Sequence, residues 1–213
     1  MSNKPTIVAA MNGPLLVTNC KMLKNYSDGT VYETDGTVAL CRCGGSKKKP
    51  FCDGHDQTNG FTGDKAPGRT PDKRKTFEGD GVTVHDNRGI CAHAGRCTDG
   101  LPSVFRTRQE PFVDPQGASA NDIIETVKSC PSGALSYAVD GVEHRDQTRD
   151  PVIFIAPNGP YAIIGGADLQ EVEWGEGASQ EHFELCRCGA STNKPFCSGA
   201  HWSVQFDEHA RKS

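Results

Sequence analysis

Two segments of the chain carry cysteines at spacings that suit metal binding. In the second segment, Cys186 and Cys188 are one residue apart, Cys197 follows after eight more residues, and His201 comes four residues later. Thiolate and imidazole groups are ligands of zinc and of iron–sulfur clusters. Neither a hydrophobic core nor a turn requires this arrangement. The sequence therefore predicts a metal centre that these four residues hold.

The first segment repeats most of this pattern. Cys41, Cys43 and Cys52 fit the cysteine spacing, but the position that corresponds to His201 holds Asp56, and His55 comes one residue early. Histidine's commoner use beside thiolates at such clusters favours His55 as the fourth ligand. The equal distance from the last cysteine to a following phenylalanine in both segments favours Asp56 instead. Both alternatives stay open, so the chain is expected to bind metal at least twice.

The kind of metal centre is indicated by the first pair of cysteines. A sulfide-bridged two-iron cluster needs two ligands for each iron, which a Cys-x-Cys pair and a Cys/His pair supply. A structural zinc site is the alternative, but zinc ligands usually come in pairs spaced by two or more residues. An aspartate ligand would lower the potential of its cluster, so the two sites are expected to differ in redox properties.

The central part of the chain contains a third group of cysteines. Cys91, Cys97 and Cys130 fit a ferredoxin frame in which Ala94 stands at the second cysteine position, and a proline follows Cys130. Three thiolates suit a [3Fe–4S] cluster. A [4Fe–4S] cluster needs another ligand, for which His93 is the nearest candidate; the alternative for His93 is a hydrogen-bonding residue of the loop.

The chain also shows an internal duplication. Residues 5–17 align without a gap with residues 151–163, including an Asn-Gly-Pro break, and both repeats are followed by a metal loop. Each repeat predicts two short strands around a turn, and residues 37–40 predict a further strand that leads into Cys41. Two such units can pack together and bury apolar faces that neither buries alone.

An unrelated unit lies between the repeats. We expect short strands at 81–85 and 135–139 and a helix that follows an N-cap at Ser119 and reaches Lys128. The expected domains are a first metal module over 1–64, a linker over 65–76, a central cluster domain over 77–142, a linker over 143–150 and a second metal module over 151–213. The fold class predicted is α+β, with two β-rich modules forming an internal pseudo-dimer around a small inserted α+β domain.

These motifs resemble two known families. Both repeats resemble the CDGSH iron–sulfur family, also called NEET proteins, with Ser198 in place of the aspartate that follows the third cysteine. This resemblance implies a [2Fe–2S] cluster bound by three cysteines and a histidine in a β-rich module. Residues 77 to 139 resemble a divergent single-cluster ferredoxin domain. The cofactors expected are two [2Fe–2S] clusters and one [3Fe–4S] or [4Fe–4S] cluster.

Composition limits the kinds of partner and the cellular location expected for the protein. The 213 residues have a net charge of -4, which argues against nucleic-acid binding. No apolar stretch reaches the length of a membrane span and the N-terminus has no signal-peptide core, so a cytoplasmic location is expected. Because disulfides are rare in the cytoplasm, metal binding explains the ten cysteines better than disulfide formation does. Cys20, which stands apart from the three groups, is expected to be a small buried side chain.

No motif predicts a substrate-processing site, so the chain is not expected to be an enzyme on its own. The function predicted is that of an electron carrier or relay, because iron–sulfur clusters exchange single electrons. The alternatives are cluster transfer or redox and pH sensing through labile histidine-ligated clusters, and a structural zinc protein. The expected partners are redox proteins, with no nucleic acid and no membrane, and the chain is expected to be a monomer.

Overall fold

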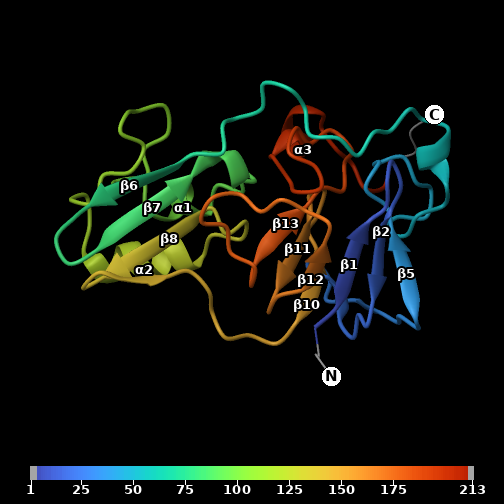
Figure 1. The fold of residues 1–213 in the computed structure, drawn as a ribbon, viewed down its shortest axis with the longest axis horizontal. Coiled ribbons are helices and arrows are strands. Elements are labelled where there is room, and N and C mark those ends of the chain that lie inside the picture. The colour runs from blue at the N-terminus through green and yellow to red at the C-terminus, as the bar shows by residue number, and fades with distance from the viewer. Residues whose placement is uncertain (1–3, 211–213) are drawn as a thin grey trace.

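The structure is a computed structural model that describes residues 4–210. It is mostly β with few helices, so its class is α+β, and Figure 1 shows one part on the left joined to a larger β-rich part on the right. The figure also shows that the larger part contains both ends of the chain. Among the described residues, no helix is long and apolar enough to cross a membrane.

The β-rich part contains two sheets that exchange strands. The first sheet has the order β12-β1-β2-β5 and the second has the order β13-β11-β10-β3-β4. The strands from the first repeat are β1 (Thr6–Ala9), β2 (Leu15–Thr18), β3 (Leu23–Asn25), β4 (Val31–Tyr32) and β5 (Thr37–Leu40). Those from the second repeat are β10 (Val152–Ile155), β11 (Tyr161–Ile164), β12 (Asp168–Gln170) and β13 (Phe183–Leu185). Each sheet therefore contains strands from both repeats: β12 pairs in parallel with β1, and β3 pairs in parallel with β10.

The two repeats build the same hairpin. Asn12 and Asn158 both have a φ of 47°, and the following glycines donate to the carbonyl oxygens of Ala10 and Ala156 at 3.0 and 3.1 Å. Asparagine tolerates this left-handed backbone better than most residues. The strands predicted in residues 5–17, 37–40 and 151–163 are thereby confirmed.

The strands alternate between a buried face and an outer face. In β2, Leu15 and Val17 are buried while Leu16 and Thr18 are exposed. The buried residues of both repeats join in one core, which includes Ile7, Leu23 and Ile163. Cys20 packs in this core, as the sequence predicts, and the strand exchange joins the two repeats through shared apolar contacts.

The central part forms a separate sheet with its own core. Its strands are β6 (Arg74–Glu78), β7 (Thr83–Asn87), β8 (Leu135–Val139) and β9 (Val142–His144), in the order β6-β7-β8-β9. Its helices are α1 (Arg96–Gly100), α2 (Ala120–Lys128) and a 3-10 helix over Arg88–Ile90, and a further 3-10 helix in the first repeat covers His55–Gln57. The predicted cap is confirmed, since Ser119 Oγ accepts from Asp122 N at 3.3 Å. Strand β6 begins inside the segment 65–76 that was expected as a linker, and strand β9 ends inside the segment 143–150.

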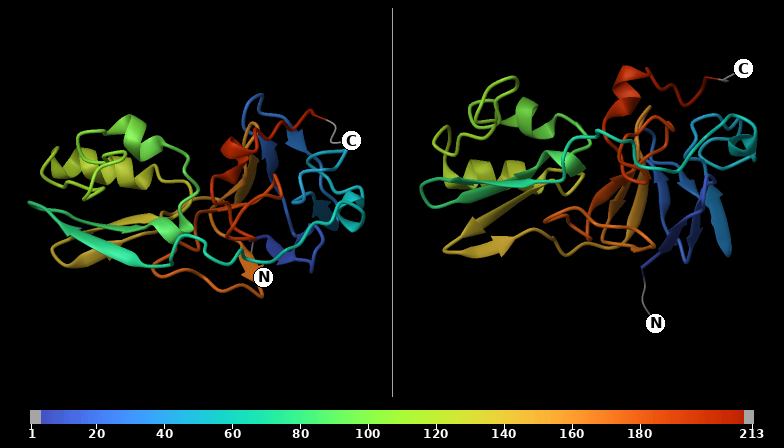
Figure 2. Two further views of the ribbon diagram at one scale, coloured as in Figure 1. Left: turned by 90° about the horizontal axis from the view of Figure 1, so that it is seen from above. Right: turned by 45° about the horizontal axis from the view of Figure 1, so that its top comes forward.

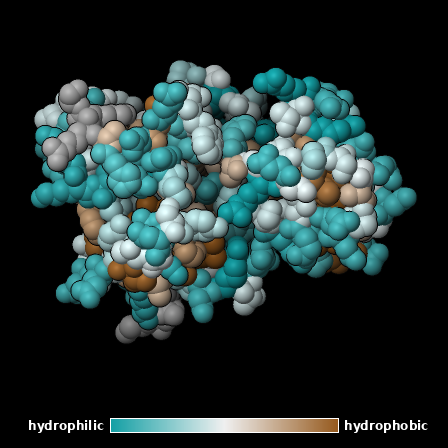
Figure 3. Space-filling view, turned by 180° about the vertical axis from the view of Figure 1, so that it is seen from behind, coloured by the Kyte–Doolittle hydropathy of each residue, from teal (hydrophilic) through white to brown (hydrophobic). Residues whose placement is uncertain are grey.

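The central domain packs beside the sheet β13-β11-β10-β3-β4, mainly through residues of the second repeat. Asn193 Nδ2 donates to Gly89 O at 3.1 Å, and Asn87 Nδ2 donates to Glu176 O at 2.9 Å. Figure 2 shows the central domain on one side of the β10–β11–β13 region, with β1, β2 and β5 on the other side. The surface seen from behind is mostly hydrophilic, with small apolar spots over the β-rich part (Figure 3).

Candidate metal centres

In each repeat, a loop that starts at the end of a strand carries the cysteines. Cys41 N donates to Pro50 O at 2.8 Å, and Cys52 N donates to Ala39 O at 2.8 Å. These bonds fold the loop back on β5, which brings Cys52 to the first two cysteines. In the second repeat, Cys186 N and Cys197 N make the same bonds, both at 2.8 Å, to Pro195 O and Glu184 O. The two loops are therefore the same structure.

Within each loop the first two thiols lie at the spacing of ligands on one metal. The Sγ atoms of Cys41 and Cys43 are 3.7 Å apart, and those of Cys186 and Cys188 are 3.9 Å apart. Two thiolates bound tetrahedrally at about 2.3 Å from one metal would be separated by about 3.8 Å. The hydrogen bond from Cys41 lowers the pKa of Cys43 to about 6. In the second loop the hydrogen bond from Cys186 likewise lowers the pKa of Cys188, while the pKa of Cys186 itself is raised.

The remaining two ligand positions of the second loop also come together. Gly199, with a φ of 76°, starts the short helix α3 (Ala200–Ser203), which turns His201 back toward Cys197. His201 is buried, and its Nδ1 lies 3.5 Å from Cys197 Sγ. A thiolate and an imidazole on one tetrahedral metal would be separated by about 3.5 Å. The backbone N–H of Gly199 also donates to Cys197 Sγ at 3.4 Å.

In the first loop it is Asp56 that takes the place of His201. Asp56 is 9% exposed, and its Oδ1 lies 3.1 Å from Cys52 Sγ. The ring of His55 lies instead against Gly45, where an added Cβ would meet His55 Cδ2 at 2.1 Å. The sequence placed both residues near the cysteines, and the structure distinguishes their positions.

An arginine between the paired cysteines braces each loop from behind. Arg42 Nε donates to Gly13 O at 2.6 Å, and Arg187 Nε donates to Gly159 O at 2.8 Å. Both guanidinium groups also stand 5.1 Å from the centre of a phenylalanine ring, Phe61 or Phe206. Both arginines are buried. Our sequence reasoning missed them, although their signal is plain: both Cys-x-Cys pairs have arginine in the middle.

The third group of cysteines surrounds a cavity in the central domain. Cys91, Cys97 and Cys130 line a cavity of about 240 Å³, together with His93 and Ala94. Burial raises the pKa of Cys91 to about 12 and that of Cys97 to about 11, and the charge of Cys130 adds to both effects. A thiol of this kind ionises when a metal compensates the negative charge.

His93 contacts this group through its backbone. Its N–H donates to Cys91 Sγ at 3.4 Å, while its ring Nδ1 lies 3.4 Å from a guanidinium nitrogen of Arg88. Its φ is 54°, a left-handed conformation.

Among residues 4–210, no three His, Cys, Asp or Glu side chains converge as the ligands of one metal ion would. Such convergence is not required for a cluster, because its ligands are distributed over several irons joined by sulfide. The ligand pairs described above fit this arrangement.

The second metal loop adjoins both of the other groups of candidate ligands. Cys43 and Cys188 form an antiparallel bridge, and a Cβ added to Gly44 or Gly189 would lie 2.4 Å from the carbonyl oxygen of Cys188 or Cys43, respectively. On its other side, the second loop meets the central domain, because a Cβ on Gly199 would lie 2.9 Å from His93 Cβ. The second loop thus touches both other groups.

Comparisons with known proteins find iron-binding families over three parts of the chain. Residues 12–55 and 158–202 match a family described as "Iron-binding zinc finger CDGSH type", and residues 77–140 match one described as "Divergent 4Fe-4S mono-cluster". The chain is 30% identical over 63 residues to "Uncharacterized protein YjdI" of Escherichia coli (strain K12). The matched residues make up 30% of this chain and 83% of that protein. The protein of the same name from Escherichia coli O157:H7 matches equally. No solved structure matches. The chain is therefore an iron–sulfur protein that contains two CDGSH-type domains with a divergent 4Fe-4S mono-cluster domain between them.

Proposed function

We propose that this protein is an electron carrier with two [2Fe–2S] clusters and one larger cluster, arranged so that the second CDGSH site adjoins both others. The observation that carries this proposal is the double contact of the second loop, through Cys188 to the first loop and through Gly199 to the central domain. When bound, such clusters supply one-electron chemistry with little rearrangement of their ligands.

The residues around the sites suit this role. Backbone N–H groups of Gly45, Gly54 and Gly199 donate to cysteine sulfurs at 3.4 Å, and such bonds stabilise negative charge on sulfur. The buried guanidinium of Arg42 places positive charge behind the first pair of thiols, whereas that of Arg187 is paired with Glu208 at 2.7 Å. They also tie each loop to the Asn-Gly-Pro turn, which holds the ligands in place without metal.

For the first site we propose Asp56 as the fourth ligand, with Cys41, Cys43 and Cys52. Its support is the 3.1 Å approach of Asp56 Oδ1 to Cys52 Sγ at the position that His201 occupies in the second loop. The carboxylate brings a negative charge, which lowers the potential of the first site relative to the second. The two CDGSH sites are then inequivalent, which gives electrons a preferred direction.

For the central site we propose Cys91, Cys97 and Cys130 as protein ligands. Three thiolates suffice for [3Fe–4S], and the matched family is described as binding 4Fe-4S, which needs one further ligand. The ring of His93 lines the same cavity as the three cysteines and lies 3.4 Å from Arg88; we propose that it makes this hydrogen bond and that a [4Fe–4S] cluster takes a non-protein fourth ligand.

The exchanged strands support a monomer whose two CDGSH-type modules form an internal pseudo-dimer. Strands β3 and β12 each pair with the other repeat, so one chain supplies both halves of the β-rich part. All ten cysteines are unpaired, which supports a reducing compartment such as the cytoplasm. The partners proposed are redox proteins.

The test is anaerobic purification followed by iron and sulfide analysis, absorption and EPR spectra, and transfer of electrons to a cytochrome acceptor from protein that has been reduced with dithionite and freed of the excess. The proposal expects iron and sulfide beyond the content of two [2Fe–2S] clusters, and acceptor reduction with no loss of iron. Iron that moves to an apo-ferredoxin during turnover would favour cluster transfer instead. Colourless protein that contains zinc would contradict both functions.

A further inference from the structure

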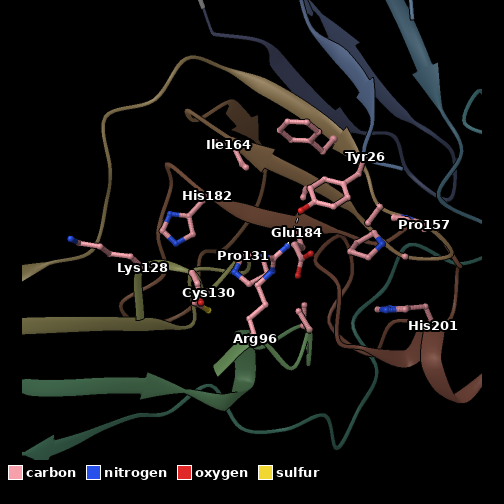
Figure 4. A pocket seen from close by; sticks show the side chains of 18 of the residues that line it. Tyr26, Arg96, Lys128, Cys130, Pro131, Pro157, Ile164, His182, Glu184 and His201 are labelled. Carbon is pink, nitrogen blue, oxygen red and sulfur yellow. Dashed lines mark hydrogen bonds between the residues drawn. The ribbon is translucent and has the colours of Figure 1, made fainter. Parts of the chain in front are cut away.

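A cleft separates the second CDGSH domain from the central domain. Its volume is about 390 Å³, which lies within the range of small-molecule sites. One wall is the outer face of the β10–β11–β13 sheet, where Phe154, Ala162 and Glu184 stand side by side in register. The facing wall comes from the central domain and includes Arg96 and Pro131 (Figure 4).

The internal duplication shows what is special about this face. The residues of the first repeat that correspond to Phe154, Ala162 and Glu184 are apolar and stand in the same register: Val8, Leu16 and Ala39. Leu16 is exposed there. The carboxyl group is therefore not needed to form the sheet, and it occurs on the copy of the face that borders the cleft.

Two buried polar atoms of this wall lack a hydrogen-bond partner within the described residues. They are Glu184 Oε2 and His182 Nε2, and these side chains belong to residues that are 6% and 2% exposed. Both residues line the cleft, as Figure 4 shows; Glu184 lies in β13 and His182 immediately precedes that strand. A buried polar atom without a partner is unfavourable, so a ligand that bonded to it would remove this cost.

The hydrogen bonds of His182 determine what its free nitrogen offers. Its Nδ1 lies 2.8 Å from Glu181 Oε2 and 3.1 Å from Ser179 Oγ, and Ser179 Oγ donates its proton to Asp146 Oδ1 at 2.6 Å. The N–H at Nδ1 of His182 therefore donates its hydrogen bond to Glu181 Oε2. The neutral ring then presents a lone pair at Nε2, which accepts a hydrogen bond, and the carboxyl group of Glu184 can accept one in either protonation state.

The other residues of the cleft select the charge and shape of a ligand. Arg96, Lys128 and Arg149 line it, which disfavours a cation, although Lys128 and Arg149 are paired with carboxylates of Glu125 and Glu181. Tyr26 and Phe154 meet edge to face, line the cleft and offer flat apolar surface. From these features we infer that the cleft binds a neutral, planar nitrogen heterocycle whose N–H or NH₂ groups donate to His182 Nε2 and Glu184 Oε2.

Adenine and purine provide a matched pair of probes, because adenine adds an NH₂ donor to the same flat neutral ring. Calorimetric titration of the intact protein is expected to show saturable binding of adenine, about tenfold tighter than that of purine. Equal binding of the two probes, or no saturable binding of adenine at millimolar concentration, would overturn the inference.

Two tryptophan substitutions place this binding in the cleft. Ala162→Trp fills the cleft from its floor and is expected to abolish adenine binding. Leu16→Trp puts the same side chain on the corresponding exposed position of the first repeat and is expected to leave binding unchanged. Retained binding in Ala162→Trp would place the ligand elsewhere and contradict the inference.

A third variant separates ligand binding from folding. Glu184→Leu removes a buried acceptor without a partner, so the melting temperature is expected to rise while adenine binding weakens about tenfold. A structural role for the carboxyl group predicts the reverse for stability. A variant that melts lower, or binds adenine as the original chain does, would overturn the assignment of Glu184.

Discussion

Gly199 of the second metal loop lies directly against His93 of the central domain. A Cβ on Gly199 would stand 2.9 Å from His93 Cβ and 3.0 Å from Ala92 O. The corresponding glycine of the first loop, Gly54, has a similar φ of 85° and no atom within 4 Å of an added Cβ. The absence of a side chain at Gly199 therefore lets the second CDGSH site and the central site approach closely.

This pair of glycines gives a matched test of the contact. Gly199→Ala and Gly54→Ala should each lose about 1 kcal/mol of stability, because alanine is strained in the left-handed region. Gly199→Ala should lose more, and it should also weaken the magnetic interaction between the second and central clusters in EPR spectra. Gly54→Ala should leave that interaction intact. Equal behaviour of the two variants would show that the contact is unimportant.

The first site should depend on Asp56 and not on His55. Asp56→Ala is expected to lose the iron of one [2Fe–2S] cluster, whereas His55→Ala keeps it, as measured by iron analysis and absorption. Asp56→His should retain the cluster and raise its potential, because a neutral ligand replaces a charged one. Loss of the cluster in His55→Ala together with its retention in Asp56→Ala would reverse the assignment.

The central site should depend on its thiols and not on the ring of His93. Cys130→Ser is expected to remove the central EPR signal while the two CDGSH signals remain, since Cys130 lines the central cavity. His93→Ala should retain the central iron, because its ring lies toward Arg88 and only its backbone N–H reaches Cys91. Central iron that is lost from His93→Ala would identify the ring as a ligand.

A buried aspartate in the central sheet should make stability fall as pH rises. Burial raises the pKa of Asp86 from 3.8 to about 6, and neither of its carboxyl oxygens has a hydrogen-bond partner within the described residues. The folded state therefore keeps a proton that the unfolded state releases, so stability declines between pH 3.8 and about 6. The free energy of unfolding falls by up to about 3 kcal/mol over this range. Asp86→Asn should remove this decline and be the more stable protein above pH 6, in urea unfolding across this range.

Glu181 should show the opposite pH dependence. Burial would raise its pKa, but hydrogen bonds from Arg149 and His182 outweigh this and lower it to about 2. The stability that the ionised Glu181 adds to the folded state is fully present above pH 4.5, the ordinary pKa of the group, and is lost as the pH falls toward 2. Glu181→Gln should therefore lose stability at neutral pH and show a flatter decline in acid. An unchanged acid limb in this variant would contradict the assignment.

The metal loops were predictable because their signals are local. Ligand spacing located the cysteines and His201, and the Asn-Gly-Pro break located both hairpins. The choice between His55 and Asp56 needed the structure, because both residues lie within reach of Cys52 in sequence. Only folding of the loop showed that His55 lies on Gly45 and Asp56 beside Cys52.

The exchange of strands between the repeats was not predictable. Strands β3 and β12 have three residues each, which is too short for an alternating pattern, and each pairs with a strand more than a hundred residues away. The same applies to the cleft, because Glu184 and His182 became notable only when the central domain covered them. In the sequence, His182 and Glu184 are simply two polar residues near a strand, and nothing indicates that they are buried.

EPR spectroscopy of the protein in its oxidised and fully reduced forms, prepared anaerobically and assayed for iron and sulfide, tests the central claim most directly, because a [3Fe–4S] cluster gives its signal when oxidised and the other cluster types when reduced. The account predicts signals from three clusters, with magnetic broadening of the second CDGSH signal by both neighbours, since its loop contacts the other two sites. Three sharp, independent signals would contradict the proposed arrangement. Protein without sulfide or iron would contradict the electron-carrier function itself.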